Sequence, residues 1–167
     1  MGESSGSEDE RRYVMYQSTK TYGNEVGLSC CFRQWRADSH CNKLHGYSLG
    51  FRFIFEAETL DERNWVYDFG GCKWIKEYLQ DEFDHKLVVA KDDRALECIK
   101  ELHIGDVAVI NIMDDVGCEK FAEMVYNHVA PKIQETTKGR VSLFSVECFE
   151  HGANSAIYQN PYGSSVI

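Results

Sequence analysis

Residues 47–57, "YSLGFRFIFEA", constrain the fold of this chain more than any other segment. Large apolar side chains alternate with small or polar ones along its length. One face carries Tyr47, Leu49, Phe51, Phe53 and Phe55. The other face carries Ser48, Gly50, Arg52 and Glu56. This period of two residues predicts a half-buried β-strand. The preceding segment 27–37, "GLSCCFRQWRA", is compatible with a strand, and we expect it to pair antiparallel with 47–57.

Two later segments have the apolar spacing of amphipathic helices. In 68–83, Asp68 can cap the first turn, and the apolar stripe consists of Trp74, Ile75, Tyr78, Leu79 and Phe83. A second helix is predicted from near Asp115, with a stripe of Cys118, Phe121, Ala122, Val125 and Val129. Pro131 follows this stripe closely.

The remaining segments predict shorter elements. Between residues 91 and 114, "ALECIKEL" suggests a short helix and "VAVIN" a short strand. Near the C-terminus, "VSLFSVECFE" and "SAIYQN" predict two strands. The intervening "HGAN" supplies the Gly and Asn that a tight turn needs.

The predicted fold class is α+β: a four-stranded antiparallel sheet with two long helices on one face, in the order β-β-α-(α-β)-α-β-β. The polar face of such a sheet can be buried inside an oligomeric barrel. Residues 1–12, "MGESSGSEDERR", have the composition of a disordered acidic tail, which leaves 13–167 as a single domain.

Composition excludes several classes of function. With 43% apolar residues among 167, the chain has enough material for one core, and no apolar run is long enough to cross a membrane. The formal charge of −9 argues against nucleic acid as a partner, because phosphate backbones are bound by clustered Lys and Arg. Seven cysteines without a secretory leader indicate free thiols and a cytoplasmic location.

Three groups of residues could carry chemistry. Cys41 and His45 lie four residues apart at the entry to the predicted strand 47–57, where each is a site residue or an ordinary core residue. Asp84 and His85 follow the first long helix, as a proton-transfer pair or as a helix end with a favourable cation. Glu150 either ends the strand as a carboxylate that can bind two adjacent N–H donors, or lies exposed in the turn.

In combination these residues form a pattern. "C-x-x-L-H-G" precedes an alternating strand, and "V-x-D-F", "D-H-x-L" and "E-x-x-x-x-x-A-I-Y" follow in order. Each motif is weak alone, but the four in register resemble the 6-pyruvoyltetrahydropterin synthase / 6-carboxytetrahydropterin synthase family over about residues 22–160. In its short length the chain is similar to members of the bacterial carboxy branch of that family, which serves queuosine and other deazapurine pathways.

The resemblance implies the tunnelling fold, with trimeric barrels that stack into hexamers, and the small-molecule pterin substrate 7,8-dihydroneopterin triphosphate. It implies that Cys41 is the catalytic thiol and that Asp84 and His85 are its proton-relay partners. It also implies that Glu150 anchors the pterin ring and that His45 is one of three zinc ligands. The product of the carboxy branch is 6-carboxy-5,6,7,8-tetrahydropterin, with acetaldehyde released.

The chain departs from the family pattern at the zinc site. Tyr47 and Arg36 stand where the family has its other two histidines. His40 could replace a lost ligand, or Arg36 could act on the substrate as a fixed positive charge. In "VGCE" (116–119), Gly117 replaces a threonine of the family, and its neighbour Cys118 joins Arg36 among the predicted substrate-binding residues.

Two functions follow from this sequence. The first is a lyase that uses Cys41, Asp84 and His85, with zinc doubtful as a cofactor. The second is a non-catalytic pterin- or purine-binding oligomer that has lost the zinc site. The basic residues nearest to the predicted site are treated as solvated surface charges, namely Arg33, Arg36, Lys43 and Lys86.

Overall fold

A long central strand organises the sheet of this chain, whose computed structural model describes residues 15–159. This strand is β3 (His45–Ala57). β2 (Leu28–Phe32) pairs antiparallel with the first part of β3, and β1 (Tyr16–Tyr22) pairs antiparallel with the second part, along the same edge. β6 (Ser142–His151) pairs with the other edge, and β7 (Asn154–Gln159) follows β6. The predicted tail 1–12 lies outside the described residues.

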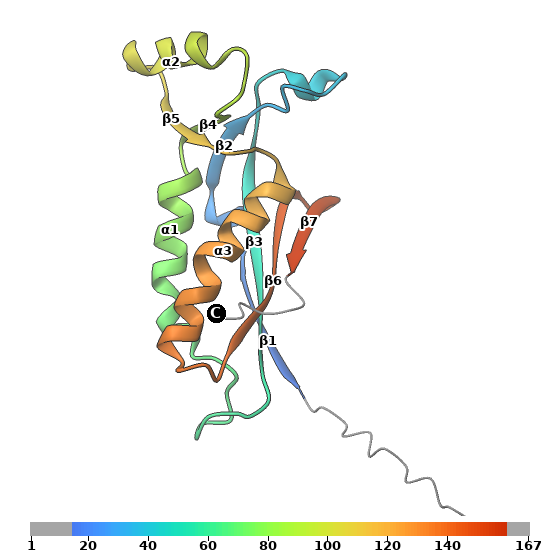
Figure 1. Cartoon of the computed structure of the whole chain (residues 1–167), viewed down its shortest axis with the longest axis vertical. Helices are drawn as coiled ribbons and strands as arrows, with labels where there is room; N and C mark the ends of the chain where they lie inside the picture. The colour runs from blue at the N-terminus through green and yellow to red at the C-terminus, as the bar shows by residue number, and fades with distance from the viewer. Residues whose placement is uncertain (1–14, 160–167) are drawn as a thin grey trace, which may run out of the picture.

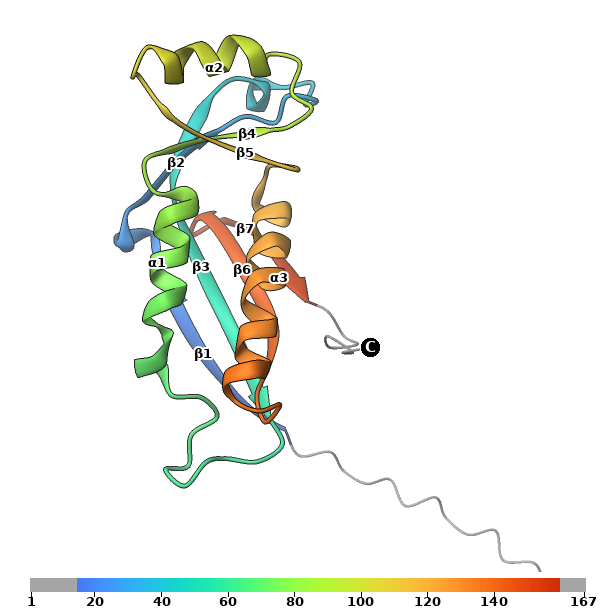
Figure 2. The ribbon, with the colours of Figure 1, turned by 60° about the vertical axis from the view of Figure 1, so that its left-hand side comes forward.

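Two long helices cover one face of the sheet, as predicted. α1 (Lys73–Phe83) follows a short 3-10 turn, η3 (Phe69–Cys72), which the Asp68 side chain caps by accepting a hydrogen bond from the Gly70 backbone at 2.9 Å. α3 (Cys118–Thr136) lies beside α1 across the strands β1, β3 and β6 (Figure 1, Figure 2). The core is therefore a two-layer packing of helices on a sheet.

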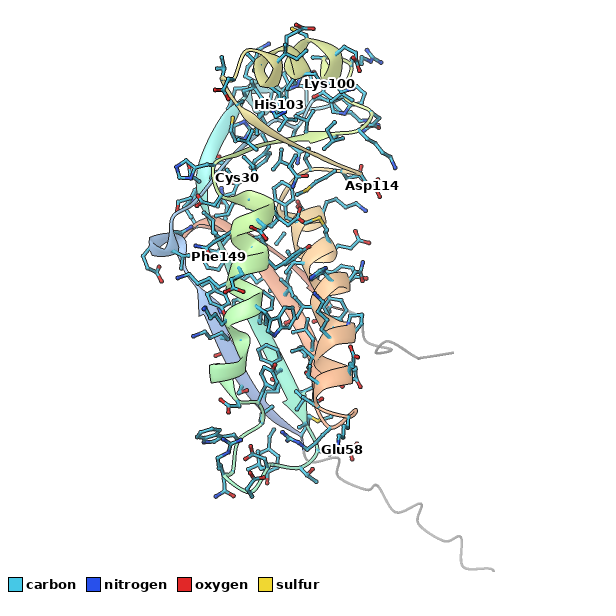
Figure 3. All side chains as sticks on the ribbon, turned by 90° about the vertical axis from the view of Figure 1, so that its left-hand side faces the viewer. Cys30, Glu58, Lys100, His103, Asp114 and Phe149 are labelled. Atoms are coloured by element: carbon cyan, nitrogen blue, oxygen red, sulfur yellow. The ribbon has the colours of Figure 1, made fainter. Side chains whose placement is uncertain are left out.

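The predicted apolar stripes meet in this core. Leu49, Phe51, Phe53 and Phe55 are all fully buried, which confirms the predicted inner face of β3. The helices contribute their own buried stripes, which include Ile75, Leu79, Phe83, Phe121, Val125 and Val129. Figure 3 shows side chains filling the space between the layers, with His103 of α2 at one end, Cys30 between it and Phe149, and Glu58 at the other end.

A βαβ unit extends the sheet beyond the ends of α1 and α3. β4 (Lys86–Ala90) pairs parallel with β2, and β5 (Val109–Met113) pairs parallel with β4. The intervening helix α2 (Leu96–Ile104) lies at one end of the molecule (Figure 1) and packs on a second cluster that includes Leu87 and Val89. The sheet order is β5-β4-β2-β3-β6-β7, with β1 also on β3.

The sheet therefore has more strands than the four predicted. The short helix and strand predicted between residues 91 and 114 are confirmed as α2 and β5, but β1 and β4 were missed. β1, "YQSTKTY", buries only Tyr22, so it lacks an apolar face. β4, "KLVVA", is a continuous apolar run buried on both faces, which has no period of two.

The second long helix continues past the proline that follows its predicted stripe. Pro131 lies inside α3, which continues to Thr136. A proline inside a helix loses one backbone hydrogen bond. Burial of Val129, Ala130 and Ile133 on either side of it offsets that loss, because the helix must reach Ile133 to complete the core.

None of the helices described between residues 15 and 159 is long and apolar enough to cross a membrane.

Candidate functional site

Cys41 lies in a short 3-10 turn, η2 (His40–Asn42), in the connection from β2 to β3. The Ser39 hydroxyl accepts a hydrogen bond from the Cys41 backbone N–H at 3.3 Å, which caps the turn. The Gln34 backbone N–H donates to the Cys41 carbonyl at 2.9 Å. The thiol is partly exposed, so a substrate can reach it.

Tyr47 is the point at which the candidate residues of one chain meet. Burial raises the pKa of Tyr47, and the nearby Glu150 carboxylate and the Cys41 and Cys118 thiols raise it further. The Glu150 carboxylate is thus an electrostatic neighbour of the Tyr47 hydroxyl. The structure therefore brings a thiol and a carboxylate to one phenol. The phenol remains protonated at neutral pH and can donate a hydrogen bond.

Aromatic rings surround this phenol. The ring centroids of Tyr47 and His45 are 5.5 Å apart, and those of Tyr47 and His151 are 6.0 Å apart. His45 also packs on Phe32, with centroids 5.0 Å apart. The His45 Nδ1 lies 2.7 Å from the Lys43 carbonyl oxygen, to which it donates a hydrogen bond that orients the ring.

Glu150 belongs to the strand and not to the turn. β6 continues to His151, so the alternative in which the strand ends at Phe149 is wrong. The Asn24 side chain donates to the Glu150 carbonyl oxygen at 3.3 Å, which ties this end of β6 to the turn between β1 and β2. The Glu150 side chain is partly exposed, so a ligand can reach its carboxylate.

A β-bulge changes the inner face of β6. Alternation along "VSLFSVECFE" predicts that Phe144, Val146, Cys148 and Glu150 share one face of this strand. The pairing with β3, however, shifts between Ile54 and Phe55. As a result Leu143 is buried instead, while Val146 and Cys148 remain in the core.

No pattern in the sequence pointed to His151 as a site residue. Strand alternation places His151 on the face opposite Glu150, which argues against a shared site. The pairing of β6 with β7 shifts between Phe149 and His151, and the His151 ring comes to lie beside Tyr47.

Cys118 lies at the start of α3, in the wall next to Tyr47. It is 7% exposed and neighbours two deeper thiols, Cys30 and Cys148. Burial raises the pKa of Cys30 to about 12 and also raises that of Cys148, where the adjacent Cys118 adds to the rise. Thiols with raised pKa stay protonated and react slowly. Cys30 and Cys148 are therefore structural, and Cys41 is the accessible thiol of this group.

Gly117 cannot be replaced by a threonine without local rearrangement. Its φ is 114°, a conformation that residues with a side chain rarely adopt. A Cβ atom at this position would lie 2.1 Å from Gln34 Nε2. That amide donates to the Val116 carbonyl at 3.1 Å, so the connection from β2 to β3 occupies the space that a side chain at 117 would need.

Asp84 and His85 form a second group, at the end of α1. The His85 Nδ1 lies 2.8 Å from the Asp84 carboxylate, which also accepts a hydrogen bond from the Ser29 backbone N–H at 3.2 Å. The His85 backbone N–H donates to the Ser29 carbonyl at 2.7 Å. The acid therefore fixes the tautomer of an imidazole whose side chain is 83% exposed.

The imidazole faces an open groove and not Cys41. His85 and Lys86 line this groove of about 700 Å³ together with apolar side chains, which include Leu44, Val107 and Val109. Tyr47 also lines this groove, but no direct polar contact links the Asp84–His85 pair to Cys41 or Glu150 in the described part of the chain.

Arg36 and His40 do not join either group. Arg36 pairs with the Asp92 carboxylate, and its guanidinium lies 4.2 Å from the centroid of the Trp35 ring. His40 is exposed at the start of η2. Arg36 is thus held at the surface by its neighbours and is not directed at Tyr47.

The donor set beside Cys41 does not fit a catalytic zinc ion. Catalytic zinc takes three protein ligands from His, Cys, Asp or Glu. Here the three family positions hold His45, the protonated phenol of Tyr47 and the ion-paired guanidinium of Arg36. No group of three or more such ligands comes together within residues 15–159.

Arg33 is not a solvated surface charge, and that prediction is wrong. Its guanidinium binds both carboxylate oxygens of Asp93, at 2.8 and 2.5 Å, and the Asp93 side chain is only 1% exposed. The Arg33 hydrogen bonds hold the pKa of Asp93 below its ordinary value. Arg33 is therefore committed to an internal ion pair and is not free to bind a phosphate.

Comparison with known proteins assigns the fold and the family. A family model described as 6-pyruvoyl tetrahydropterin synthase matches residues 23–161. A 6-carboxy-5,6,7,8-tetrahydropterin synthase of Rickettsia bellii is 29% identical over 111 residues, which cover 66% of this chain and 78% of that protein. The homologous enzyme of Rickettsia felis is 27% identical over 94 residues, which cover 56% of this chain and 67% of that protein.

Solved structures agree on the fold. An uncharacterized protein of Wolinella succinogenes, WS1659, superposes with a TM-score of 0.74 at 19% identity, covering 88% of this chain and 99% of that one. The 6-pyruvoyl tetrahydropterin synthase of Plasmodium falciparum gives a TM-score of 0.61 at 11% identity, covering 87% and 98%. These likenesses support the tunnelling fold that the sequence predicted. The chain belongs to the 6-pyruvoyl tetrahydropterin synthase family.

Proposed function

We propose that this chain is a pterin-processing lyase that converts 7,8-dihydroneopterin triphosphate into 6-carboxy-5,6,7,8-tetrahydropterin, a precursor of deazapurines such as queuosine. The observation that carries the proposal is the meeting of the accessible Cys41 thiol and the Glu150 carboxylate at Tyr47. Family membership and the name of the Rickettsia bellii relative support the same class of reaction. Overall, the reaction consumes one water and releases triphosphate and acetaldehyde.

Each residue has a definite task in this proposal. The Glu150 carboxylate accepts the two adjacent N–H groups at the pyrimidine edge of the pterin, as a bidentate anchor. Anchoring the ring directs the side chain of the substrate toward Cys41, whose thiolate removes a proton from it. Tyr47 donates a hydrogen bond to an oxygen of that side chain, where a developing negative charge is stabilised.

The Asp84–His85 pair supplies a proton on the face of the ring opposite Cys41. In this proposal the pair belongs to a neighbouring copy of the chain. Two observations support this arrangement. Within one chain the pair contacts Ser29 and faces an open groove. In addition, β1 and β7 each have one edge that pairs with no other described strand, so copies can join edge to edge. We therefore propose a homo-oligomer, a trimeric barrel or a hexamer of two such barrels.

The proposed reaction uses no zinc, because the donor set beside Cys41 does not fit the ion. The same misfit favours the second candidate, a non-catalytic pterin- or purine-binding oligomer. Retention of an accessible Cys41 favours the enzyme over the binder, because binding alone has no need for a thiol at this position.

Product analysis distinguishes the two candidates. Purified protein is incubated with 7,8-dihydroneopterin triphosphate, with and without EDTA, and the products are identified by mass. We expect 6-carboxy-5,6,7,8-tetrahydropterin, acetaldehyde and triphosphate at equal rates in both samples, and no stoichiometric zinc by elemental analysis. Unchanged substrate that remains bound to the protein would establish the binder. Turnover that EDTA abolishes and zinc restores would overturn the metal-free reaction.

A further inference from the structure

The turn that carries Cys41 is closed by several hydrogen bonds of its own, but it has few links to other segments of the molecule. It lies in a connection, 33–44, that contains no strand and only the 3-10 turn η2. Its strongest attachment to the rest of the molecule is Arg33. The Arg33 Nη1 donates a hydrogen bond to the Asn42 carbonyl oxygen at 3.1 Å, one residue after Cys41. The same guanidinium binds Asp93 through Nε and Nη2, at 2.8 and 2.5 Å.

Asp93 is a rigid anchor for this guanidinium. It is 5% exposed and follows β4, and its backbone N–H donates to the Ala90 carbonyl at 3.0 Å. Its Oδ1 also accepts a hydrogen bond from the Ala95 backbone N–H at 2.8 Å. Together these two links fix Asp93 in the connection from β4 to α2. A bidentate Arg–carboxylate pair with such support is strong and has a defined geometry.

A second, exposed link joins the same two segments. The Trp35 indole N–H donates to the Asp92 carboxylate at 3.2 Å, and Arg36 pairs with the same residue. Exposed ion pairs contribute little free energy. The buried Arg33–Asp93 pair is therefore the principal connection between the Cys41 turn and the end of β4.

The opposite ends of the same two strands hold the Asp84–His85 pair. β2 and β4 are parallel neighbours in the sheet. At their starts, Ser29 is hydrogen-bonded to both Asp84 and His85. At their ends, Arg33 is bonded to Asp93. The β2–β4 pair thus holds the Asp84–His85 pair at one end and, through Arg33 and Asp93, the Cys41 turn at the other.

We propose that Arg33, anchored by Asp93, is a positioning residue that holds the Cys41 turn at a fixed place on the β2–β4 strand pair. The inference rests on the proposed function in one respect, that Cys41 is the reacting thiol. Arg33 does not touch the substrate, and it acts by fixing the Asn42 carbonyl and with it the adjacent thiol. Small misplacements of a reacting group are costly, about 10²-fold for 1 Å.

The test compares Arg33→Met with wild type and measures both turnover and thiol chemistry. Arg33→Met keeps an unbranched side chain but removes all three hydrogen bonds. We expect kcat to fall about 10- to 100-fold, while the pterin KM changes by less than about threefold because Glu150 is untouched. We also expect iodoacetamide to alkylate Cys41 several-fold faster than in wild type, as followed by peptide mass mapping, because the turn has lost its anchor.

Further variants separate positioning from folding. Arg33→Lys keeps a charge for Asp93 and should recover part of kcat, and Asp93→Asn should reproduce the effects of Arg33→Met. Arg63→Met, which removes exposed ion pairs to Asp61 and Asp68 far from the turn, is the matched control and should match wild type. The alkylation rate of exposed Cys98 should be the same in every variant that is folded.

The outcomes are distinct. A lower melting temperature for Arg33→Met with unchanged kcat and unchanged Cys41 alkylation would overturn the positioning role and leave a purely structural ion pair. If wild type forms no product, the proposed function fails. The alkylation rates then still decide whether Arg33 fixes the Cys41 turn.

Discussion

The Cys41→Ala protein should lose turnover by about 10²- to 10⁴-fold, the usual contribution of a positioned acid or base. Its affinity for pterins should stay within about twofold of wild type, because the Glu150 carboxylate that holds the ring is unchanged. Product formation measures the first effect, and fluorescence titration with neopterin measures the second.

Cys98→Ala provides the control for this substitution. Cys98 is an exposed thiol on α2, remote from Tyr47, so its removal should change neither measurement. Cys30 and Cys148 are unsuitable controls because they are buried in the core. Full activity in Cys41→Ala would remove this thiol from the mechanism and leave Tyr47 and Glu150 as parts of a binding site only.

Glu150→Gln should weaken pterin binding by about 10- to 100-fold, since a hydrogen bond to a charged group contributes about 1.5–3 kcal/mol. The substitution keeps the size of the side chain but replaces one acceptor oxygen by an amide nitrogen that can only donate. One of the two ring N–H groups is then left without a partner. Titration with neopterin measures the affinity directly.

Glu147→Gln is the matched control on the same strand. Glu147 lies three residues earlier on β6, where it pairs with Arg52 at 3.1 Å and accepts a hydrogen bond from Ser155. It has no contact with Tyr47 in the described structure, so pterin affinity should be unaffected. Equal affinities in both variants would show that Glu150 is not the anchor of the ring.

Strong periodicity made the central part of the fold predictable from sequence. In β3, alternation identified the buried set of Leu49, Phe51, Phe53 and Phe55 correctly. The stripes of α1 and α3 were predicted for the same reason, because a face must be apolar to be buried. β1 was not predictable in this way, since its neighbour β3 supplies the apolar surface and β1 contributes mainly backbone hydrogen bonds.

Other errors came from interactions between residues distant in sequence. Arg33 looked like a surface charge because its partner, Asp93, is 60 residues away. His151 looked unrelated to Tyr47 because strand alternation ignores the register shift at the end of β6. The bulge that replaces Phe144 by Leu143 in the core is likewise set by pairing with β3. None of these three features can be recognised from the residues that neighbour it in the sequence.

The candidate site was predictable in part. The resemblance to the family pointed to Cys41, Glu150 and the Asp84–His85 pair, whose roles stay predictions, and Cys41, Cys118 and Glu150 are electrostatic neighbours of Tyr47. The role of Tyr47 as the centre of this group needed coordinates, because in the sequence it was only a missing histidine. The separation of Asp84–His85 from Cys41 within one chain also emerges only from the fold.

The most direct measurement is a crystal structure of the Cys41→Ala protein soaked with 7,8-dihydroneopterin triphosphate. It should show both Glu150 carboxylate oxygens about 2.7–3.1 Å from ring nitrogens, with the substrate side chain between residue 41 and the His85 imidazole of an adjacent subunit. A pterin bound elsewhere, or a subunit arrangement that leaves His85 remote from the occupied ring, would contradict the shared lyase site.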